Sequence, residues 1–464
     1  MNRNLALLLV LVAVSRLLLL GESPFEVDSV LLARAVEDFD PTAMRPHPPG
    51  YAGLVGLAKA FPFDAELSLR VVSALSAVPL VWAVWAIAKR LDGDAMLAAT
   101  LVAANPVLWF YGLHENAYAA GGAGAACTAW AVLVARDREG PRSVWVLGLA
   151  LGLTGALRPS LLVFLAPLAL YGAGLRRLHH LAIGAALPTL AWIGASAWAS
   201  GGLGEFLGSV LHQFTWIREG HPDHWRLHQV HHLAVYAAQA CAGGLLLLPW
   251  LRRLGDWKLL ALWAGVPFAF HLVVYVAKAG YLVPYLPAVA VLASLAAAPR
   301  ALKIAAPILS AAFFLFAQPV DVEADRTPKR AFAEKTWPER IRSEVSFFST
   351  ASLARIRNQD RVNEGYAALM GTHARPGRTT VIWVDRWDAA ICEHLVEGIK
   401  VVDLRTPKLE IPVEGRRIMV LAWDEPGEGF SPVESPDGYG AWVRDLELED
   451  LPTTIFSIEA VPVY

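Results

Sequence analysis

The sequence predicts a mainly α-helical, polytopic membrane protein with a small α/β domain at its C-terminal end. The first observation is composition: 55% of the 464 residues are hydrophobic and 18% are charged, with a mean hydropathy of +0.42. Soluble globular proteins carry about 25% charged residues, so this balance favours a membrane protein. The second observation is a change near residue 318, after which acidic and basic residues mix with Pro and Gly. We therefore predict a transmembrane domain at 1–318 and an α/β domain at 319–464.

Apolar runs in the first domain predict about eleven transmembrane helices. The run 5–20 resembles a signal peptide, but a basic residue interrupts it and no small-residue cleavage site follows, so we expect a retained span. As one helix, 144–175 would be roughly 45 Å long, which exceeds a hydrocarbon core of about 30 Å. We expect it to turn at Gly155, Arg158 and Pro159. The expected spans are 5–20, 67–88, 96–113, 117–135, 144–157, 161–175, 181–199, 233–250, 259–276, 282–298 and 304–317.

Basic residues indicate which loops share one side of the membrane. Lys and Arg cluster in alternate short loops, which favours the cytoplasmic side for those loops. With a cytoplasmic N-terminus, the loops 21–66 and 200–232, the turn 114–116 and the domain after residue 318 lie on the outer face. The predicted location is the cell membrane, multi-pass, with the C-terminal domain extracytoplasmic. The basic loop residues are Lys89, Arg90, Arg136, Arg138, Arg142, Arg176, Arg177, Arg252, Arg253, Lys258, Arg300 and Lys303.

The C-terminal region has the alternating pattern of a small α/β domain. Helical patterns cover 334–370 and 389–397, and short β-branched runs at 379–384, 400–403 and 417–423 predict strands. The region is too polar for the membrane and contains enough aromatic residues to form a core.

The first outer loop carries unusual charge for its place between two apolar spans. Glu26 and Asp28 follow the first span, where a carboxylate can face water and a polar substrate together; a solvated loop acid is the alternative. Arg45 and His47 lie in a proline-rich run ending at Tyr51. Consecutive prolines favour an extended backbone that holds both side chains in fixed directions, as phosphate binding requires. A proline-rich entry into the next helix is the alternative.

Three further outer positions carry polar groups. The turn His114-Glu115-Asn116 offers a second acidic site, with a polar interfacial turn as the alternative. Arg158, between two short spans, is costly if it faces lipid, so we expect it to face a cavity or an anion. Lys278 is a lone cation on the outer side, which also indicates an anion, although a snorkelling lysine is the alternative.

Histidines are concentrated in the second outer loop, and four of them have helical spacings. Zinc is one interpretation, but no compact set of acidic or cysteine ligands accompanies them, and histidine also occurs at membrane interfaces. We expect the cysteines, which are far apart, to pack in apolar surroundings. The net charge of -2 gives no indication of a nucleic-acid partner. These residues are His212, His221, His224, His228, His231 and His232, and Cys127, Cys241 and Cys392.

Taken in order, these motifs resemble the GT-C superfamily of polytopic glycosyltransferases. The nearest relatives in pattern are the protein O-mannosyltransferases and the aminoarabinose transferases of lipid A. The resemblance covers about residues 1–318 and depends mainly on the order of short motifs. These motifs are an acid after the first span, His47-Pro48-Pro49-Gly50-Tyr51, the polar turn 114–116, Arg158-Pro159, and Lys278-x-Gly280-Tyr281-x-x-Pro284-x-x-Pro287.

The resemblance implies transfer of a hexose or pentose from a polyprenyl-phosphate donor to a hydroxyl group at the outer face, with inversion. Asp28 matches the superfamily's first-loop acid and is the expected general base. Many relatives have an Asp-Glu pair where Ser29 follows Asp28 here, so dependence on a divalent metal stays open and the motifs assign no cofactor. The donor-phosphate candidates are Arg158, Lys278, Tyr281, Arg45 and His47, and the substrate-binding candidates are Glu115 and Glu26.

Two other functional classes stay open. A transporter or channel with an outer domain would place its polar pocket near the bilayer midplane and often shows inverted repeats; neither pattern is present. A non-catalytic assembly protein would leave Arg158 and Lys278 without a function. The acceptor, whether a glycan, a lipid or a protein, is not identified by any motif.

Overall fold

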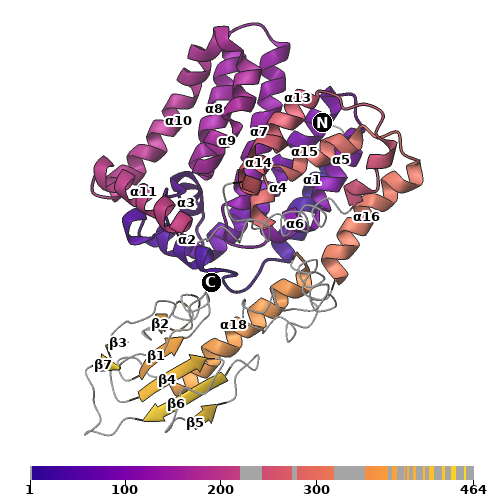
Figure 1. The fold of residues 1–464 in the computed structure, drawn as a ribbon. Helices are drawn as coiled ribbons and strands as arrows, with labels where there is room; N and C mark the ends of the chain where they lie inside the picture. Colours follow the sequence, from indigo (N-terminus) through magenta and orange to yellow (C-terminus); the bar gives the residue numbers. More distant parts are fainter. Residues whose placement is uncertain are drawn as a thin grey trace. The chain divides into compact units, whose positions relative to one another are not determined.

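The computed structural model describes residues 3–219, 243–273, 279–317 and 351–374, and, after these, the strands and single positions between 379 and 455. These residues form two compact units (Figure 1). The first unit contains 3–20, 31–317 and 351–355 in their described parts. The second unit contains Gly21–Val30 together with the described residues from 356 onward. The short segment Gly21–Val30 therefore folds with C-terminal residues, although a division at residue 318 places it in the first domain.

The first unit is built mainly from helices, and four of them, α7 to α10, lie side by side (Figure 1). Its helices begin where polar caps are available: Asp64, Asp94 and Asn105 accept hydrogen bonds from the first backbone N–H groups of α4, α5 and α6. The helices are α1 Arg3–Leu18, α2 Val27–Glu37, η1 Pro41–Ala43, α3 Ala52–Lys59, α4 Ala65–Arg90, α5 Ala95–Ala103, α6 Pro106–Tyr111, α7 Tyr118–Asp137, α8 Pro141–Leu157, α9 Pro159–Ala173, η2 Leu175–Arg177, α10 Leu178–Ala199, α11 Leu203–Glu219, η3 Leu248–Trp250, α13 Trp257–Leu260, the π-helix η4 Ala261–Gly265, α14 Val266–Val273, η5 Ala279–Leu282, α15 Leu286–Ser294 and α16 Arg300–Phe316.

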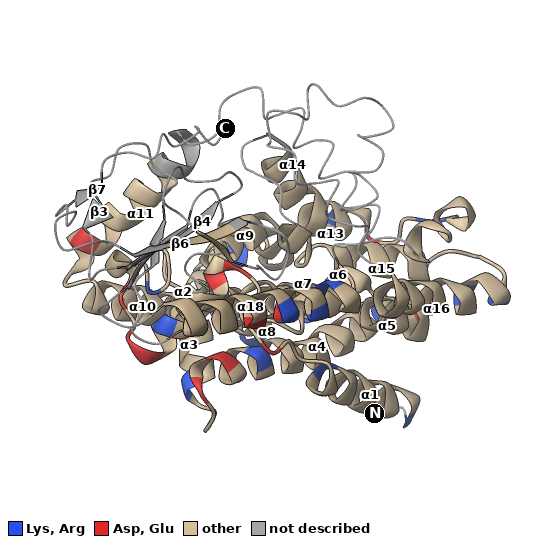
Figure 2. Cartoon of the chain, turned by 90° about the horizontal axis from the view of Figure 1, so that it is seen from below, with Lys and Arg blue, Asp and Glu red and all other residues tan. Residues whose placement is uncertain are grey.

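Apolar helices of this unit have the length and surface of membrane spans. Within the described residues, three helical stretches are long and apolar enough to cross a bilayer: Ala65–Arg90, Tyr118–Asp137 and Leu175–Ala199. Large apolar side chains face outward, and on α10 Leu187 is 76% exposed. In Figure 2 most of the helical ribbon is tan, that is, formed by residues other than Lys, Arg, Asp and Glu. A surface of this kind is stable against lipid and unfavourable in water.

Glycines bring α8 and α10 into backbone contact. A Cβ added at Gly148 would lie 2.3 Å from the carbonyl oxygen of Leu181, and one at Gly184 would lie 2.3 Å from that of Trp145. Small residues allow this close approach, which supplies van der Waals packing where lipid removes the hydrophobic driving force. The four-residue spacing of Gly148 and Gly152 along α8 therefore determines how α8 meets α10.

The observed helices differ from the expected spans at two breaks. The expected break in 144–175 is confirmed, because α8 ends at Leu157 and α9 begins at Pro159. The expected single span 96–113 is wrong: Asn105 caps a new helix at Pro106 and divides the run into α5 and α6. Most of the expected span 233–250 lies outside the described residues, and the number of eleven spans stays a prediction.

The segment 21–66, predicted as the first outer loop, contains helices that the sequence analysis did not predict. α2 and α3 are 11 and 8 residues long, too short to span a bilayer, and so they gave no span signal. Leu32 and Ala33 of α2 pack into a core with Leu54 of α3 and Leu69 of α4. The described part of the segment 200–232, predicted as the second outer loop, is also helical, as α11.

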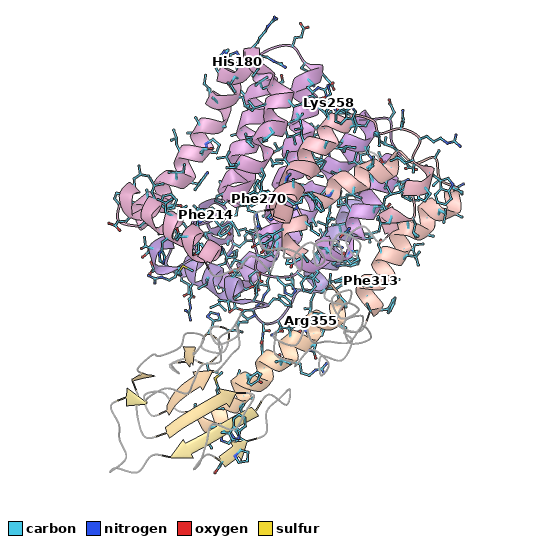
Figure 3. All side chains as sticks on the ribbon, in the orientation of Figure 1. His180, Phe214, Lys258, Phe270, Phe313 and Arg355 are labelled. Atoms are coloured by element: carbon cyan, nitrogen blue, oxygen red, sulfur yellow. The ribbon has the colours of Figure 1, made fainter. Side chains whose placement is uncertain are left out.

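The basic loops meet at one end of the first unit, as expected for loops on the same side of a membrane. Arg90 pairs with Asp137, Arg136 pairs with Asp256, and Lys303 lies 3.4 Å from Asp94. Figure 3 labels His180 and Lys258 at this end of the bundle. Contacts between loops that follow α4, α7 and η3 thus join the predicted basic side into one surface.

The second unit contains a helix packed on a mixed sheet (Figure 1). The sheet order is β2-β1-β4-β6-β5; β2, β1 and β4 are parallel, and β6 and β5 are antiparallel to their neighbours. Tyr366 and Met370 of α18 form the core with Met419 of β4 and Ala441 of β6. The elements are α18 Leu353–His373, β1 Thr379–Trp383, β2 Val401–Asp403, β3 Ile411–Pro412, β4 Arg417–Ala422, β5 Ser431–Val433, β6 Gly440–Asp445 and β7 Thr454–Ile455, with β3 and β7 as a separate pair.

Candidate functional site

The break between α8 and α9 places an arginine at the junction of two apolar helices. Arg158 is extended, with φ -150° and ψ 98°, and Pro159 begins α9 at the position where a missing N–H costs nothing. Gly155 lies inside α8 and not in the turn. The break between the two helices therefore lies at Arg158 itself.

Aromatic rings surround the Arg158 side chain. It is 8% exposed, and its guanidinium carbon lies 4.3 Å from the centre of the Tyr118 ring and 5.3 Å from that of Tyr281. Gly121 of α7 makes room, because a Cβ there would lie 3.1 Å from the Arg158 side chain. Among the described residues, this guanidinium forms no ion pair and no hydrogen bond. Stacking on rings leaves the N–H groups at its edge available to an anion.

The Gly280-Tyr281 motif forms the other wall of this aromatic cluster. A Cβ at Gly280 would lie 2.8 Å from the Tyr118 ring, so only glycine allows the contact. The Tyr281 ring stacks on buried His271 of α14 at 4.8 Å with an interplanar angle of 3°. His271 in turn exchanges a hydrogen bond of 3.0 Å with the hydroxyl of Tyr285. Short motifs distant in sequence therefore build one cluster, which we call the Arg158 cluster: Arg158, Tyr118, Tyr281, His271 and Tyr285.

The turn between α6 and α7 is buried, which excludes the interfacial alternative for it. Glu115 is 0% exposed and accepts a hydrogen bond from Arg70 of α4, which also pairs with Glu66 one helical turn earlier at 2.7 Å. Asn116 accepts from the backbone N–H groups of Tyr118 and Ala119 and thereby caps α7. Burial raises the pKa of the Glu115 carboxyl to about 7, and Arg70 opposes part of that rise. The turn thus fixes the start of the helix that carries Tyr118.

The proline-rich loop is turned, and not extended as the sequence analysis predicted. The Arg45–Pro46 and Pro48–Pro49 peptide bonds are cis, and Tyr51 has φ 56°. The half-exposed Arg45 lies 2.5 Å from Asp38 and 3.8 Å from Asp40. His47 lies 2.9 Å from the Tyr51 hydroxyl, at hydrogen-bond distance. Both donor-phosphate candidates of this loop therefore have protein partners nearby.

Asp28 and Glu26 lie at the start of α2. Asp28 is in the first turn, where the helix dipole stabilises a carboxylate, and its side chain is half-buried. The backbone N–H of Ser29 donates to the carbonyl of Glu26 at 2.9 Å. Asp28 therefore stands on a regular element and not on a loose loop, as a group that takes part in chemistry requires.

The remaining candidates are Lys278 and the histidines of the segment 200–232. Lys278 and the histidines from His221 to His232 lie outside the described residues, while His212 is exposed on α11. Within the described part of the chain, no group of three or more His, Cys, Asp or Glu side chains could hold a metal ion. Metal dependence stays open.

Comparisons with known proteins agree with this architecture. Residues 46–198 match the family model for dolichyl-phosphate-mannose-protein mannosyltransferase. The whole fold is similar to that of ArnT from Cupriavidus metallidurans in the apo state, with a TM-score of 0.61 and 14% identity, covering 94% of this chain and 97% of that one. The same protein bound to undecaprenyl phosphate gives a TM-score of 0.57 and 13% identity, covering 96% and 98%. No curated protein sequence matched the chain significantly.

This chain has the GT-C fold. The resemblance predicted from short motifs is thereby confirmed, and the family match and the fold indicate an integral membrane protein. The match to the family model includes His47, Glu115 and Arg158, and so it covers most of the proline-rich loop, the turn and the helix break described above.

The sequence analysis missed three residues of this candidate site. Tyr118 and His271 have no local signal, because aromatic residues and single histidines are common in apolar helices. Arg70 did have one: a charged residue one turn after Glu66 on a long apolar helix requires a partner. Each of the three contacts a residue that the sequence analysis did identify: Tyr118 contacts Arg158, His271 contacts Tyr281, and Arg70 contacts Glu115.

Proposed function

We propose that this protein is a membrane glycosyltransferase that moves a sugar from a polyprenyl-phosphate donor to an acceptor hydroxyl, with inversion. The observation that carries the proposal is Arg158: a buried guanidinium, stacked on tyrosines, with no carboxylate partner among the described residues. An unpaired buried charge costs several kcal/mol, so it is retained where it binds an anion. The similarity in fold to a protein solved with undecaprenyl phosphate supports a lipid phosphate as that anion.

In this proposal, Asp28 acts as the general base. Its carboxylate takes the proton from the acceptor hydroxyl while that oxygen forms a bond to the anomeric carbon. The bond from the anomeric carbon to the phosphate oxygen breaks, and the lipid phosphate leaves with the electron pair. Arg158 stabilises the negative charge that develops on the leaving phosphate, and burial strengthens this interaction. Because the acceptor oxygen attacks the anomeric carbon from the side opposite the leaving phosphate, the configuration at that carbon is inverted.

The other candidates take supporting roles in the proposal. Tyr281 orients the Arg158 guanidinium by stacking, and Lys278, two residues before Gly280, is a second phosphate ligand. Arg45 and His47 are secondary candidates, since Arg45 would have to exchange Asp38 for a phosphate. Glu115 supports the substrate side by fixing Arg70 and the start of α7, and Glu26 contacts the acceptor.

We place the reaction at the outer face of the cell membrane, with the N-terminus and the joined basic loops cytoplasmic. About eleven spans and an extracytoplasmic α/β unit complete this topology. The donor's polyprenyl tail lies among the apolar helices, and the acceptor is a hydroxyl-bearing glycan, lipid or protein. A divalent metal is compatible with the proposal but is not required by any described group.

The test is transfer from radiolabelled polyprenyl-phosphate sugars by the purified full chain. We expect turnover by the unaltered protein and a loss of about 100- to 10,000-fold in Asp28→Asn, the usual contribution of a general base. Glu37→Gln, an exposed acid on the same helix, is the matched control and should keep full activity. Equal turnover by a folded Asp28→Asn variant would remove Asp28 from the mechanism, and transport of the lipid without transfer would favour the transporter alternative.

A further inference from the structure

The segment that leads into α2 is held by α18 of the C-terminal sequence, within the second unit. Asp360 accepts hydrogen bonds through one oxygen from the backbone N–H groups of Glu22 (3.1 Å) and Ser23 (2.9 Å) and from the Ser23 hydroxyl (3.0 Å). Asn363 donates from its amide to the Ser23 hydroxyl (2.8 Å) and to the carbonyl of Pro24 (2.9 Å). Five hydrogen bonds therefore join two side chains to three consecutive residues.

These contacts are sheltered from water and fix the direction of the backbone. Asp360 is 5% exposed, Asn363 is 1% exposed and Ser23 is 5% exposed. Asp360 and Asn363 are three residues apart, which places them on one face of the helix. Because they bind backbone N–H and C=O groups, they determine the path of the chain and not only its position.

A second layer holds the carboxylate in place. Arg357, one turn earlier on α18, lies 3.4 Å from Asp360 and 3.2 Å from Glu22. Tyr366 and Met370 anchor the same helix to the sheet of the second unit. The five hydrogen bonds from Asp360 and Asn363 to residues 22–24, which we call the grip, therefore come from a helix that is packed on a sheet. Precise positioning of a segment requires such support.

We propose that Asp360 and Asn363 are positioning residues for Asp28. Asp28 lies four residues after Pro24, in the first turn of a helix that begins three residues after Pro24. α18 thus sets the direction in which the chain enters α2, and with it the position of Asp28 on that helix. This inference rests on the proposed function of Asp28, but the grip itself can be measured without catalysis.

The first experiment measures the grip by hydrogen exchange of the full chain. Asp360→Asn and Asn363→Leu should each accelerate exchange of the backbone amides at 22–29, with exchange in α7 and α8 unchanged. Glu364→Gln, an exposed acid on the same helix, is the matched control and should leave exchange unchanged. Ser23→Ala perturbs the same contacts from the other side and covers the case in which an α18 variant does not fold. Unchanged exchange at 22–29 would overturn the proposal, whatever the activity of the protein.

The second experiment asks whether the grip acts through Asp28. Asp360→Asn should lower kcat by about 10- to 100-fold, while the affinity for undecaprenyl phosphate stays within twofold, since Arg158 is untouched. In the Asp28→Asn background, Asp360→Asn should cause no further loss. An independent, multiplicative loss in that background would overturn the positioning role. An inactive unaltered protein would instead refute the proposed function, and the exchange measurement would still decide whether Asp360 and Asn363 hold the segment.

Discussion

Replacing Arg158 by methionine should weaken ligand binding without lowering the stability of the unliganded protein. The guanidinium is 8% exposed and has stacking contacts with Tyr118 and Tyr281 but no anionic partner among the described residues. Each ring contributes roughly 2 kcal/mol to a desolvated cation, against a desolvation cost of several kcal/mol for the ion. Without ligand, Arg158→Met should therefore be as stable as the unaltered protein, or more stable.

The same change should weaken binding of a lipid phosphate. A hydrogen bond to a charged partner contributes about 1.5–3 kcal/mol, which corresponds to a roughly 10- to 150-fold rise in Kd if one such bond is lost. Arg158→Lys keeps the charge but loses the planar fork and its stacking, and we expect an intermediate Kd. Arg176→Met, an exposed arginine among the basic loops, is the control and should bind as the unaltered protein does.

Thermal unfolding in detergent, followed by tryptophan fluorescence, measures both effects, since bound ligand stabilises the folded state by an amount that grows with the logarithm of the ratio of ligand concentration to Kd. The titrant is undecaprenyl phosphate, with phosphatidylglycerol as a control for any anionic lipid. Unchanged Kd in Arg158→Met would refute the assignment of Arg158 to the phosphate. A large fall in Tm without ligand would show that Arg158 has an anionic protein partner in the folded chain.

Three further substitutions test the surroundings of the site. Arg70→Met should destabilise the fold by about 3–5 kcal/mol in chemical unfolding, because it leaves Glu115 buried without its cation, and the double variant with Glu115→Gln should recover part of this loss. Burial raises the pKa of Glu115 to about 7 from 4.5, so its ionisation should lower the free energy of unfolding as pH rises between about 4.5 and 7, and Glu115→Gln should remove that slope. Gly280→Ala should shift the Tyr118 ring, cost about 1–3 kcal/mol and reduce lipid-phosphate affinity, whereas Gly56→Ala, with open space at its Cβ, should do neither.

Local signals explain which parts of the fold were predictable. The α8–α9 break could be predicted from the length of the apolar run 144–175 and from the adjacent Arg158 and Pro159. These residues affect the backbone at their own positions, so no distant contact is needed to predict the break. The α5–α6 break had a signal of the same kind, Asn105 followed by Pro106, but the apolar residues on both sides concealed it. The short helix α2 could not be predicted as a span, because its burial depends on residues of α3 and α4 that the sequence does not place beside it.

Non-local contacts explain what was missed in the site. Arg158 could be identified because burying a guanidinium between apolar helices costs desolvation free energy. The aromatic rings that offset part of this free energy come from α7 and η5, which are distant in sequence. Asp28 could be proposed as a candidate from its place after the first span, whereas the contact of Asp360 with Ser23 joins positions 337 residues apart. No periodicity or composition connects such positions, and only the folded chain brings them together.

The geometry also explains why the order of short motifs was informative although each motif is weak. Gly280 is required by the ring of Tyr118, Tyr118 begins the helix capped by the polar turn, and Tyr281 stacks on both Arg158 and His271. A change in any one of these residues alters the surroundings of the same guanidinium. The residue types of these motifs therefore depend on one another, because all of them contact or position the same buried cation. A sequence that contains them in this order can form the Arg158 cluster.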